Sequence, residues 1–333
     1  MMRPDFFQFL RSPLLWVPVI LAALLPYGLS SYHLAIGTLA LLYVSLALSW
    51  NIVGGMAGQI SLTHSVFVGC GAIFASSLLV RLGVNLWIAM AIAAAVSAAI
   101  GVFIALVDSR FRLGHLSFAL VTLAFAEIGE LVVSGSEWLG GASGIDLPKD
   151  RGQFWQFQFG GGSGYFWAAL VLALICLVVS QAILSSRLGY FLRAVRDNED
   201  AAQAIGIRLF RAKAMAMAIS AALSSVAGTL YARYSNFVDP SLLASPNLTI
   251  EIVLVATIGG LGTPLGPLLA ALVLIPCGEL LRGRFGGSLP GLHFFLYGVL
   301  IIIVVLTSPE GMVPRLFGLW KRFVAGRARS RDV

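Results

Sequence analysis

The sequence predicts an all-α, polytopic membrane protein with about ten transmembrane helices, some of them short or re-entrant. Of the 333 residues, 59% are apolar and 11% are charged, whereas soluble domains carry about 25% charged residues. The charges are also segregated, because residues 12–80 contain no Asp, Glu, Lys or Arg. A bilayer-spanning helix needs about 20 mostly apolar residues, so this run alone can hold three spans. The composition excludes a soluble enzyme, a disordered protein and a nucleic-acid-binding domain.

Ten apolar segments follow one another along the chain. They cover residues 13–30, 34–53, 59–80, 85–107, 114–133, 165–184, 213–232, 248–262, 265–281 and 290–307. The first follows Arg3 and Arg11 and has some features of a signal peptide, but it is long enough to span, so we expect an uncleaved helix. Only Gly262, Thr263 and Pro264 separate the eighth segment from the ninth, and both are short. These two segments form either two spans or one re-entrant pair.

The basic residues of the loops predict that both termini lie in the cytoplasm. With ten spans in this orientation, the inside segments hold 16 of the 22 Lys and Arg residues and the outside segments hold 6. Cytoplasmic loops carry an excess of Lys and Arg, and the inverted orientation would violate this rule. We therefore expect a cytoplasmic segment at 1–12, one membrane domain at 13–314 and a basic cytoplasmic tail at 315–333. Two loops are long, an outer one at about 134–164 and an inner one at about 185–212.

The basic tail is interpreted as a feature of the membrane surface. It carries six basic residues against one Asp, directly after the last apolar segment. Such a tail is typical of the cytoplasmic side of a membrane protein, where it faces anionic lipid. We therefore expect the lipid bilayer and no nucleic acid as a partner. The three cysteines lie far apart without a CxxC pair, so no metal site is expected.

The inner loop contains a short helix with clear boundary signals. Asp197 or Asn198 suits the N-cap position. Glu199 and Asp200 would then lie in the first turn, where the helix dipole favours negative charge. Gly206 suits a left-handed C-terminal cap. The residues between the two caps should form about two helical turns.

This short helix is expected to present a small apolar face. Ala201, Ala202 and Ile205 stand at i, i+1 and i+4, so they share one side of a helix. Two turns are too few to be stable alone, and something must pack on them. The helix either lies on its own protein as a solvated connector or is bound by a partner. The residues alone leave both interpretations open.

Several stretches of the sequence together resemble a known family. Asp200-Ala201-Ala202-xxx-Gly206 resembles the EAA loop of bacterial ABC-importer permeases, with Asp in place of the usual Glu. The chain is more specifically similar to branched-chain amino acid importer permeases of the LivM type. Four further stretches carry this resemblance: GGMAGQISLTH at 54–64, FALVTLAFAE at 118–127, LGGASGI at 139–145 and IEIVLVATIGGLGTPLGP at 250–267. The match runs in order over roughly residues 34–318.

The resemblance implies a permease subunit of an ATP-binding-cassette importer in the bacterial cytoplasmic membrane. It implies that the helix starting at Glu199 docks on a cytoplasmic ATPase and transmits ATP-driven closure to the membrane helices. It also implies a second related permease, two ATPase subunits and an extracytoplasmic solute-binding protein. The solute would be a small amino acid, branched-chain in the first place, or a related small polar solute such as urea or a short amide.

ATP is expected to bind to a separate subunit, and this chain is expected to hold no cofactor. A P-loop requires Gly-Lys followed by Ser or Thr. None of Lys149, Lys213 and Lys321, the three lysines of the chain, is followed by Ser or Thr. The chain is therefore expected to be a transporter subunit without a catalytic residue.

Polar residues inside the apolar segments are candidates for the translocation path. The candidates are Asn51, Gln59, Ser61, His64, Glu127 and Glu251. Ionisable residues inside a span cost about 2.5–3.5 kcal/mol each on insertion scales, so each needs a reason. The first four flank an expected helix break at Gly54–Gly58, and broken helices can line a cavity. The same residues could instead bond neighbouring helices, and the two Glu residues could contact the binding protein at the outer interface.

A stand-alone ion- or proton-coupled secondary transporter is the alternative function. Such a carrier usually needs acidic residues at mid-membrane depth. Glu127, Glu130 and Glu251 lie toward the ends of their segments instead. A carrier of this kind also has no need of the capped helix in the inner loop. A membrane-embedded enzyme would need an active-site cluster, and the sequence contains none that we recognise.

Overall fold

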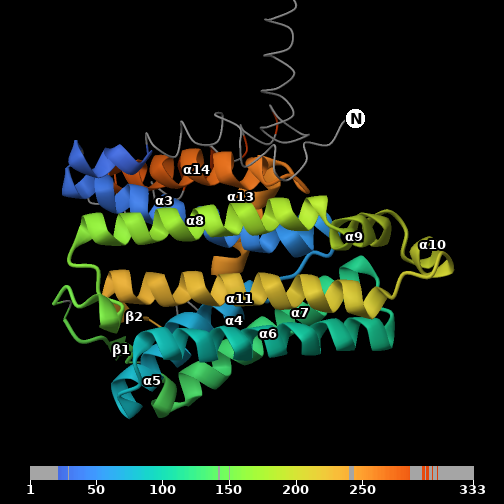
Figure 1. Cartoon of the computed structure of the whole chain (residues 1–333), viewed down its shortest axis with the longest axis horizontal. Helices are drawn as coiled ribbons and strands as arrows, with labels where there is room; N and C mark the ends of the chain where they lie inside the picture. The colour runs from blue at the N-terminus through green and yellow to red at the C-terminus, as the bar shows by residue number, and fades with distance from the viewer. Residues whose placement is uncertain are drawn as a thin grey trace, which may run out of the picture.

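The computed structural model of this chain describes residues 22–28, 30–141, 143–149, 151–239 and 244–285, and six helical positions between 295 and 306. The regular elements of the described part are helices, apart from one short pairing of two strands (Figure 1). The segment 1–12 and the tail 315–333 lie outside the described residues, as do most of the first and tenth predicted spans.

The elements alternate between long helices and short connecting pieces. In chain order they are η1 (Leu25–Tyr27), α3 (Ser31–Asn51), η2 (Ile52–Met56), α4 (His64–Gly69), η3 (Cys70–Phe74), α5 (Ala75–Leu82), α6 (Leu86–Phe111), α7 (His115–Gly135), η4 (Glu137–Leu139), β1 (Ile145–Asp146), η5 (Phe154–Gln156), α8 (Gly162–Ser185), α9 (Arg187–Asp197), α10 (Glu199–Ala204), α11 (Leu209–Ser235), β2 (Phe237–Val238), α13 (Pro246–Gly259) and α14 (Leu265–Phe285).

Seven described helical segments are long and apolar enough to cross a membrane. They are Ser31–Met56, His64–Leu82, Leu86–Phe111, His115–Gly135, Gly162–Ser185, Leu209–Ser235 and Leu265–Phe285. Each matches one predicted apolar segment, namely the second to seventh and the ninth. The all-α, polytopic prediction is therefore confirmed. The total of ten spans and the cytoplasmic position of both termini remain predictions.

The eighth predicted segment forms a helix that is too short to cross a bilayer. α13 has 14 residues, which corresponds to about 21 Å at 1.5 Å per residue. The hydrocarbon core of a bilayer is about 30 Å thick. α13 therefore reaches only part of the way, and it packs against α14 and α3.

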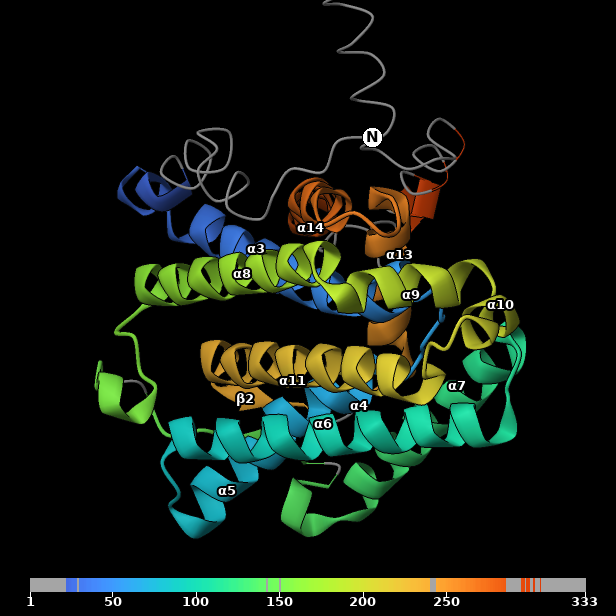
Figure 2. The same ribbon diagram turned by 45° about the vertical axis from the view of Figure 1, so that its right-hand side comes forward.

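The long helices lie roughly side by side, so their connections gather at two opposite ends of the molecule (Figures 1 and 2). One end carries β1, β2 and η5, which belong to or adjoin the predicted outer loop. The other end carries α9 and α10, which form the predicted inner loop. α11 packs along α6, and α3 packs along α8 and α14. α3 is the most buried of the seven spans and α7 is the least buried.

Glycines allow α11 to lie against the α4–η3 segment at backbone distance. A Cβ added at Gly71 would overlap the Ser225 carbonyl, and one added at Gly228 would overlap the Val68 carbonyl. The hydroxyl of Thr229 donates to the Gly71 carbonyl at 2.8 Å. Small residues permit such close approach in lipid, where helix association depends on van der Waals packing and hydrogen bonds.

Two glycine-rich breaks separate consecutive helices. The first interruption follows η2, where residues 57–63 are not helical and Gly58 has φ +73°. The second separates α13 from α14 at residues 260–264, where Gly260 and Gly262 have φ +112° and +79°. The predicted break near Gly54–Gly58 is therefore confirmed, and its non-helical part begins at Ala57.

Candidate functional site

The short helix of the inner loop is capped at both ends. The Asn198 side chain accepts a hydrogen bond from the Ala201 amide at 2.9 Å, which makes Asn198 the N-cap of α10. Gly206 has φ +88°, and the amide of Ile207 donates to the Ala202 carbonyl at 3.1 Å. Both predicted caps are confirmed. The helix ends one residue earlier than the predicted range 199–205.

The apolar face expected on α10 is divided between two sides of the helix. Ala202 is only 2% exposed and packs against its own chain, whereas Ile205 is 76% exposed. Ala201 and Asp200 are also exposed, and the Glu199 side chain is partly covered. The expectation of one shared face was therefore wrong for Ala202. Asp200, Ala201 and Ile205 form the surface that α10 offers to a partner.

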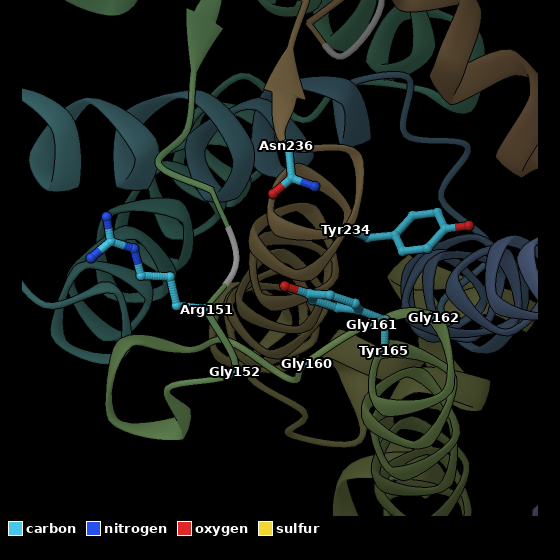
Figure 3. Close-up of a pocket in the computed structure, with 8 residues that line it drawn as sticks. All are labelled: Arg151, Gly152, Gly160, Gly161, Gly162, Tyr165, Tyr234 and Asn236. Atoms are coloured by element: carbon cyan, nitrogen blue, oxygen red, sulfur yellow. The ribbon is translucent and has the colours of Figure 1, made fainter.

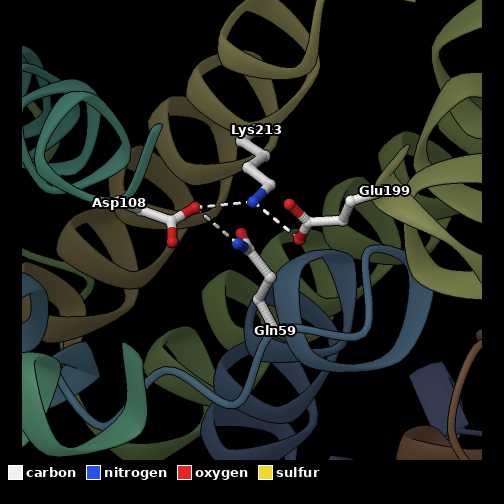
Figure 4. A network of polar contacts seen from close by, with 4 residues as sticks. All are labelled: Gln59, Asp108, Glu199 and Lys213. Atoms are coloured by element: carbon white, nitrogen blue, oxygen red, sulfur yellow. Dashed lines mark hydrogen bonds and ion pairs between the residues drawn. The ribbon is translucent and has the colours of Figure 1, made fainter. Parts of the chain in front are cut away.

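Glu199 turns from α10 into a buried polar network (Figure 4). Its Oε1 lies 2.7 Å from Lys213 Nζ, at the start of α11. The same Nζ lies 2.7 Å from Asp108 Oδ2, near the end of α6. Gln59 Nε2 donates to that Oδ2, also at 2.7 Å. The network thus connects the inner-loop helix with two membrane helices and with the first helix break.

The centre of this network is almost completely enclosed. The side chains of Lys213 and Asp108 are 2% and 0% exposed, whereas that of Glu199 is 33% exposed. Buried charges persist when they are paired and hydrogen-bonded. The ion pair between Lys213 and Asp108 satisfies this condition for both partners.

Arg196 forms a second connection between the inner loop and the helix breaks. It lies on α9, and its guanidinium donates to the Gly55 carbonyl at 3.0 Å. A Cβ at Gly262 would lie 2.9 Å from the same guanidinium, so Arg196 lies between the two breaks. Asn51 holds these breaks together, because it accepts from the Gly262 amide and donates to the Thr263 carbonyl, each at 3.0 Å.

The other predicted path residues near the first break are buried and contact neighbouring elements. His64 Nε2 lies 2.8 Å from the Ser220 hydroxyl, which donates to the Ser49 carbonyl at 2.6 Å. Because that hydroxyl proton is already used, His64 must donate from Nε2. The Ser61 carbonyl accepts from Trp50 Nε1 at 2.8 Å. These contacts stabilise helix packing within the chain, and the path-lining role of these residues remains a prediction.

The two predicted carboxylates occupy different surroundings. Glu251 on α13 accepts a hydrogen bond from the Tyr43 hydroxyl at 2.8 Å, which connects α13 to α3. Glu127 is exposed on α7, the least buried span, and has exposed apolar neighbours such as Leu120 and Leu131. A carboxylate in a span almost always faces a bundle interior or a water-filled cavity. This face of α7 therefore requires a cover other than lipid.

The opposite end of the molecule carries an open cavity of about 630 Å³ (Figure 3). Its lining residues come from the predicted outer loop and the adjacent ends of α8 and α11: Arg151, Gly152, Gly160, Gly161, Gly162, Tyr165, Tyr234 and Asn236. The loop is joined to β2, just after α11, by the pairing of Ile145 with Val238. The buried Arg233 adds a hydrogen bond of 2.7 Å to the Pro148 carbonyl.

A family model described as the permease component of branched-chain amino acid transport systems matches residues 32–305 of this sequence. The chain belongs to this family. The match includes both helix breaks, the inner loop and the outer loop, so the site described above lies wholly within the family's domain. The chain is accordingly a membrane permease component of a transport system and not an enzyme.

Individual permeases show the same relationship. The high-affinity branched-chain amino acid permease LivM of Escherichia coli (strain K12) is 29% identical, over 89% of this chain and 73% of the relative. A probable LivM of Methanocaldococcus jannaschii is 25% identical, over 73% and 72% of the two chains. LivH of Salmonella typhimurium is 26% identical, over 45% and 46%. No solved structure matches this permease.

Sequence reasoning missed three functional candidates of this permease. From the sequence alone, no role was assigned to Asp108, Arg196 or Lys213. Asp108 gave a signal, since it ends the uncharged run 82–107. Its partner Lys213 is 105 positions away, and no local pattern identifies a contact at that separation.

Proposed function

We propose that this permease is a subunit of an ATP-binding-cassette importer for small amino acids, branched-chain ones in the first place, or for related small polar solutes. One observation carries the proposal. α10 offers Asp200, Ala201 and Ile205 to the outside, while Glu199 on the same helix contacts the buried network. A surface of this kind suits a partner that moves α10 and thereby moves the membrane helices.

The partner at α10 is an ATPase in this proposal, with two copies in the complete transporter. ATP binds to the ATPase, and the permease itself holds no cofactor. A second homologous permease completes the membrane part, and LivH relatives at 26% identity are of suitable kind. The complex lies in the bacterial cytoplasmic membrane with α10 and both termini on the cytoplasmic side. The excess of basic residues on that side supports this orientation.

The translocation path is proposed to run between the two permeases. Glu127 supports this position because it is exposed on the least buried span. A partner permease or the water of the path would cover it. Asn51, Gln59, Ser61 and His64 are proposed to border the inner part of the path. Glu251 is proposed to stand at its rim, where it contacts Tyr43.

An extracytoplasmic binding protein is proposed to deliver the solute to the outer loop. The open cavity beside Tyr165 and Tyr234 gives this end a recessed surface. Trp155 is 83% exposed on the same loop, and Trp is typical of contact surfaces between proteins. The outer loop is fixed to α11 by Arg233, so a protein bound there would contact a membrane helix indirectly.

Reconstitution in proteoliposomes tests the function. The permease is co-purified with a candidate ATPase and the second permease, and uptake of labelled leucine is measured with the binding protein outside. We expect uptake that requires ATP on the ATPase side and that stops when the binding protein is omitted. Uptake driven by a proton or sodium gradient without the ATPase would instead identify a secondary transporter.

A further inference from the structure

We propose that Lys213 is a positioning residue of the transport cycle, which joins α10 to the first helix break through a releasable ion pair with Glu199. This inference rests on the proposed function, since it assumes an ATPase that moves α10. It goes beyond that function because it names the atoms that carry the motion into the membrane domain.

Lys213 lies between two carboxylates with different surroundings. Its Nζ is 2.7 Å from Asp108 Oδ2 and 2.7 Å from Glu199 Oε1. The Asp108 side chain is 0% exposed and lies on a membrane helix, whereas the Glu199 side chain is 33% exposed and lies on the projecting helix (Figure 4). One ammonium group thus connects a fixed partner with a partner that can reach water.

The balance of charge decides which of the two contacts can open. If Glu199 leaves, Lys213 and Asp108 remain as a neutral buried pair, and the released carboxylate gains water. If Asp108 and Lys213 separate, the fully enclosed Asp108 carboxylate loses its ion partner and cannot gain water in exchange, which strongly disfavours that movement. The contact with Glu199 is therefore the releasable one, and the contact with Asp108 is the permanent one.

The permanent pair reaches the first helix break through Gln59. Asp108 Oδ2 accepts from both Lys213 Nζ and Gln59 Nε2, so a shift of the ammonium changes the environment of the amide. The backbone N–H of the same residue closes the end of η2, since it donates to the Val53 carbonyl at 3.2 Å. A displacement of α10 is thereby passed to η2, which directly follows α3.

Asp108 also offers an acceptor for a second arrangement. Its Oδ1 is buried and has no hydrogen-bond partner among the residues that the structure describes. Buried acceptors are seldom left unsatisfied, and each exception needs an explanation. When Glu199 withdraws, Lys213 or Gln59 can turn toward this oxygen without leaving the Asp108 carboxylate. The network thus has two arrangements that share one permanent ion pair.

The test measures coupling in the complete transporter, as the ratio of ATP hydrolysed to solute transported in proteoliposomes. Glu199→Ala opens the releasable contact permanently. We expect at least an approximately fivefold higher ratio, which is the lower end of typical coupling between two sites. Gln203→Ala is the matched control, because it shortens an exposed polar side chain on the same helix outside the network. The ratio of this control should equal that of the unmodified transporter.

A second background separates a coupling role from a merely structural one. The double variant Asp108→Asn with Lys213→Met removes both buried charges together and leaves neither unpaired. In this background, Glu199→Ala should cause no further rise of the ratio of ATP hydrolysed to solute transported, because the ammonium that Glu199 contacts is already gone. This comparison is a double-mutant cycle, in which the effects of interacting residues do not add. An equal rise in both backgrounds would overturn the proposal, as would an unchanged ratio in Glu199→Ala alone. If the unmodified complex showed no ATP-dependent uptake, that result would refute the proposed function instead.

Discussion

Asn51 and Gly262, 211 positions apart in the sequence, hold the two helix breaks of the permease together. The side-chain Oδ1 of Asn51 accepts from the Gly262 amide at 3.0 Å. Its amide group donates to the Thr263 carbonyl, also at 3.0 Å. One side chain thus satisfies backbone groups that the interruption between α13 and α14 leaves without helical partners. Asn51 is 0% exposed, so water cannot replace it in this chain.

Asn51→Ala is therefore expected to destabilise the permease. Each buried backbone group that loses its partner costs about 1–3 kcal/mol. The amount of folded protein in detergent and its thermal unfolding temperature should both fall. Thr257→Ala is the control, because Thr257 lies on α13 with an exposed surface and donates only to the Val253 carbonyl within its own helix. Equal unfolding temperatures for the two variants would contradict the role of Asn51.

Gly206→Val is expected to weaken ATPase association without affecting membrane insertion. Gly206 has φ +88°, and a residue with a Cβ is disfavoured there by about 1–2 kcal/mol. Among the residues that the structure describes, none beyond the chain neighbours of Gly206 lies within 4 Å of an added Cβ, so the effect comes from the backbone and not from a clash. Gly206→Asn is the control, since Asn tolerates the left-handed region. ATPase co-purification is measured per inserted permease, and equal losses in both variants would argue against a backbone effect.

Ile205→Asp and Ala202→Asp are expected to act in different ways. Ile205 is 76% exposed, so its replacement should release the ATPase while the permease keeps its thermal stability. Ala202 is 2% exposed against its own chain, so a carboxylate there would be buried and would unfold the inner loop. Limited proteolysis of the loop distinguishes the two results. Full ATPase association and full transport with Ile205→Asp would show that α10 is a solvated connector.

His64→Ala tests the translocation path at the first helix break. If His64 borders the path, transport per inserted permease should fall while the ATPase still associates. The contact between His64 and Ser220 also joins α4 to α11 at 2.8 Å. Ser220→Ala is the comparison, because it removes this contact and leaves the imidazole in place. Equal losses of folded protein in both variants, with unchanged transport per molecule, would assign His64 to packing alone.

The orientation in the membrane is tested by reporters that are active only outside the cytoplasm. A reporter fused after Val333 should be silent, and one inserted near Gly152 should be active. The 16-to-6 distribution of basic residues is the reason for this expectation. The opposite pair of results would show that the permease has the inverted orientation. Activity at both sites would show that the number of spans between the two sites differs from the predicted number.

Much of the helical framework could be predicted from the sequence, because its signals are local. Uncharged apolar runs indicate the spans, and η2 with residues 57–63 interrupts them where glycines gather. The caps of α10 were predicted from Asn198 and Gly206, since capping depends on the backbone of the next few residues. The helix α9 was not predicted, although its apolar residues recur at the spacing of an amphipathic surface helix.

The arrangement around these helices could not be predicted in the same way. The ion pair between Asp108 and Lys213 joins positions 105 residues apart. The hydrogen bond from Arg196 to the Gly55 carbonyl joins positions 141 residues apart. Such contacts depend on how whole helices pack, which local patterns do not specify. The inward position of Ala202 depends on packing for the same reason.

The exposed carboxylate of Glu127 has a consequence for the life of the subunit in the cell. A permease without its partners would present this charge to acyl chains on its most uncovered helix. That state is unfavourable, because a carboxylate that faces lipid has neither water nor a partner. Orphan copies would therefore be less stable than copies in the complete complex, and instability in the cell lowers abundance. The abundance of this chain would then follow that of its partners, and the stoichiometry of the complex would be enforced by turnover rather than by synthesis alone.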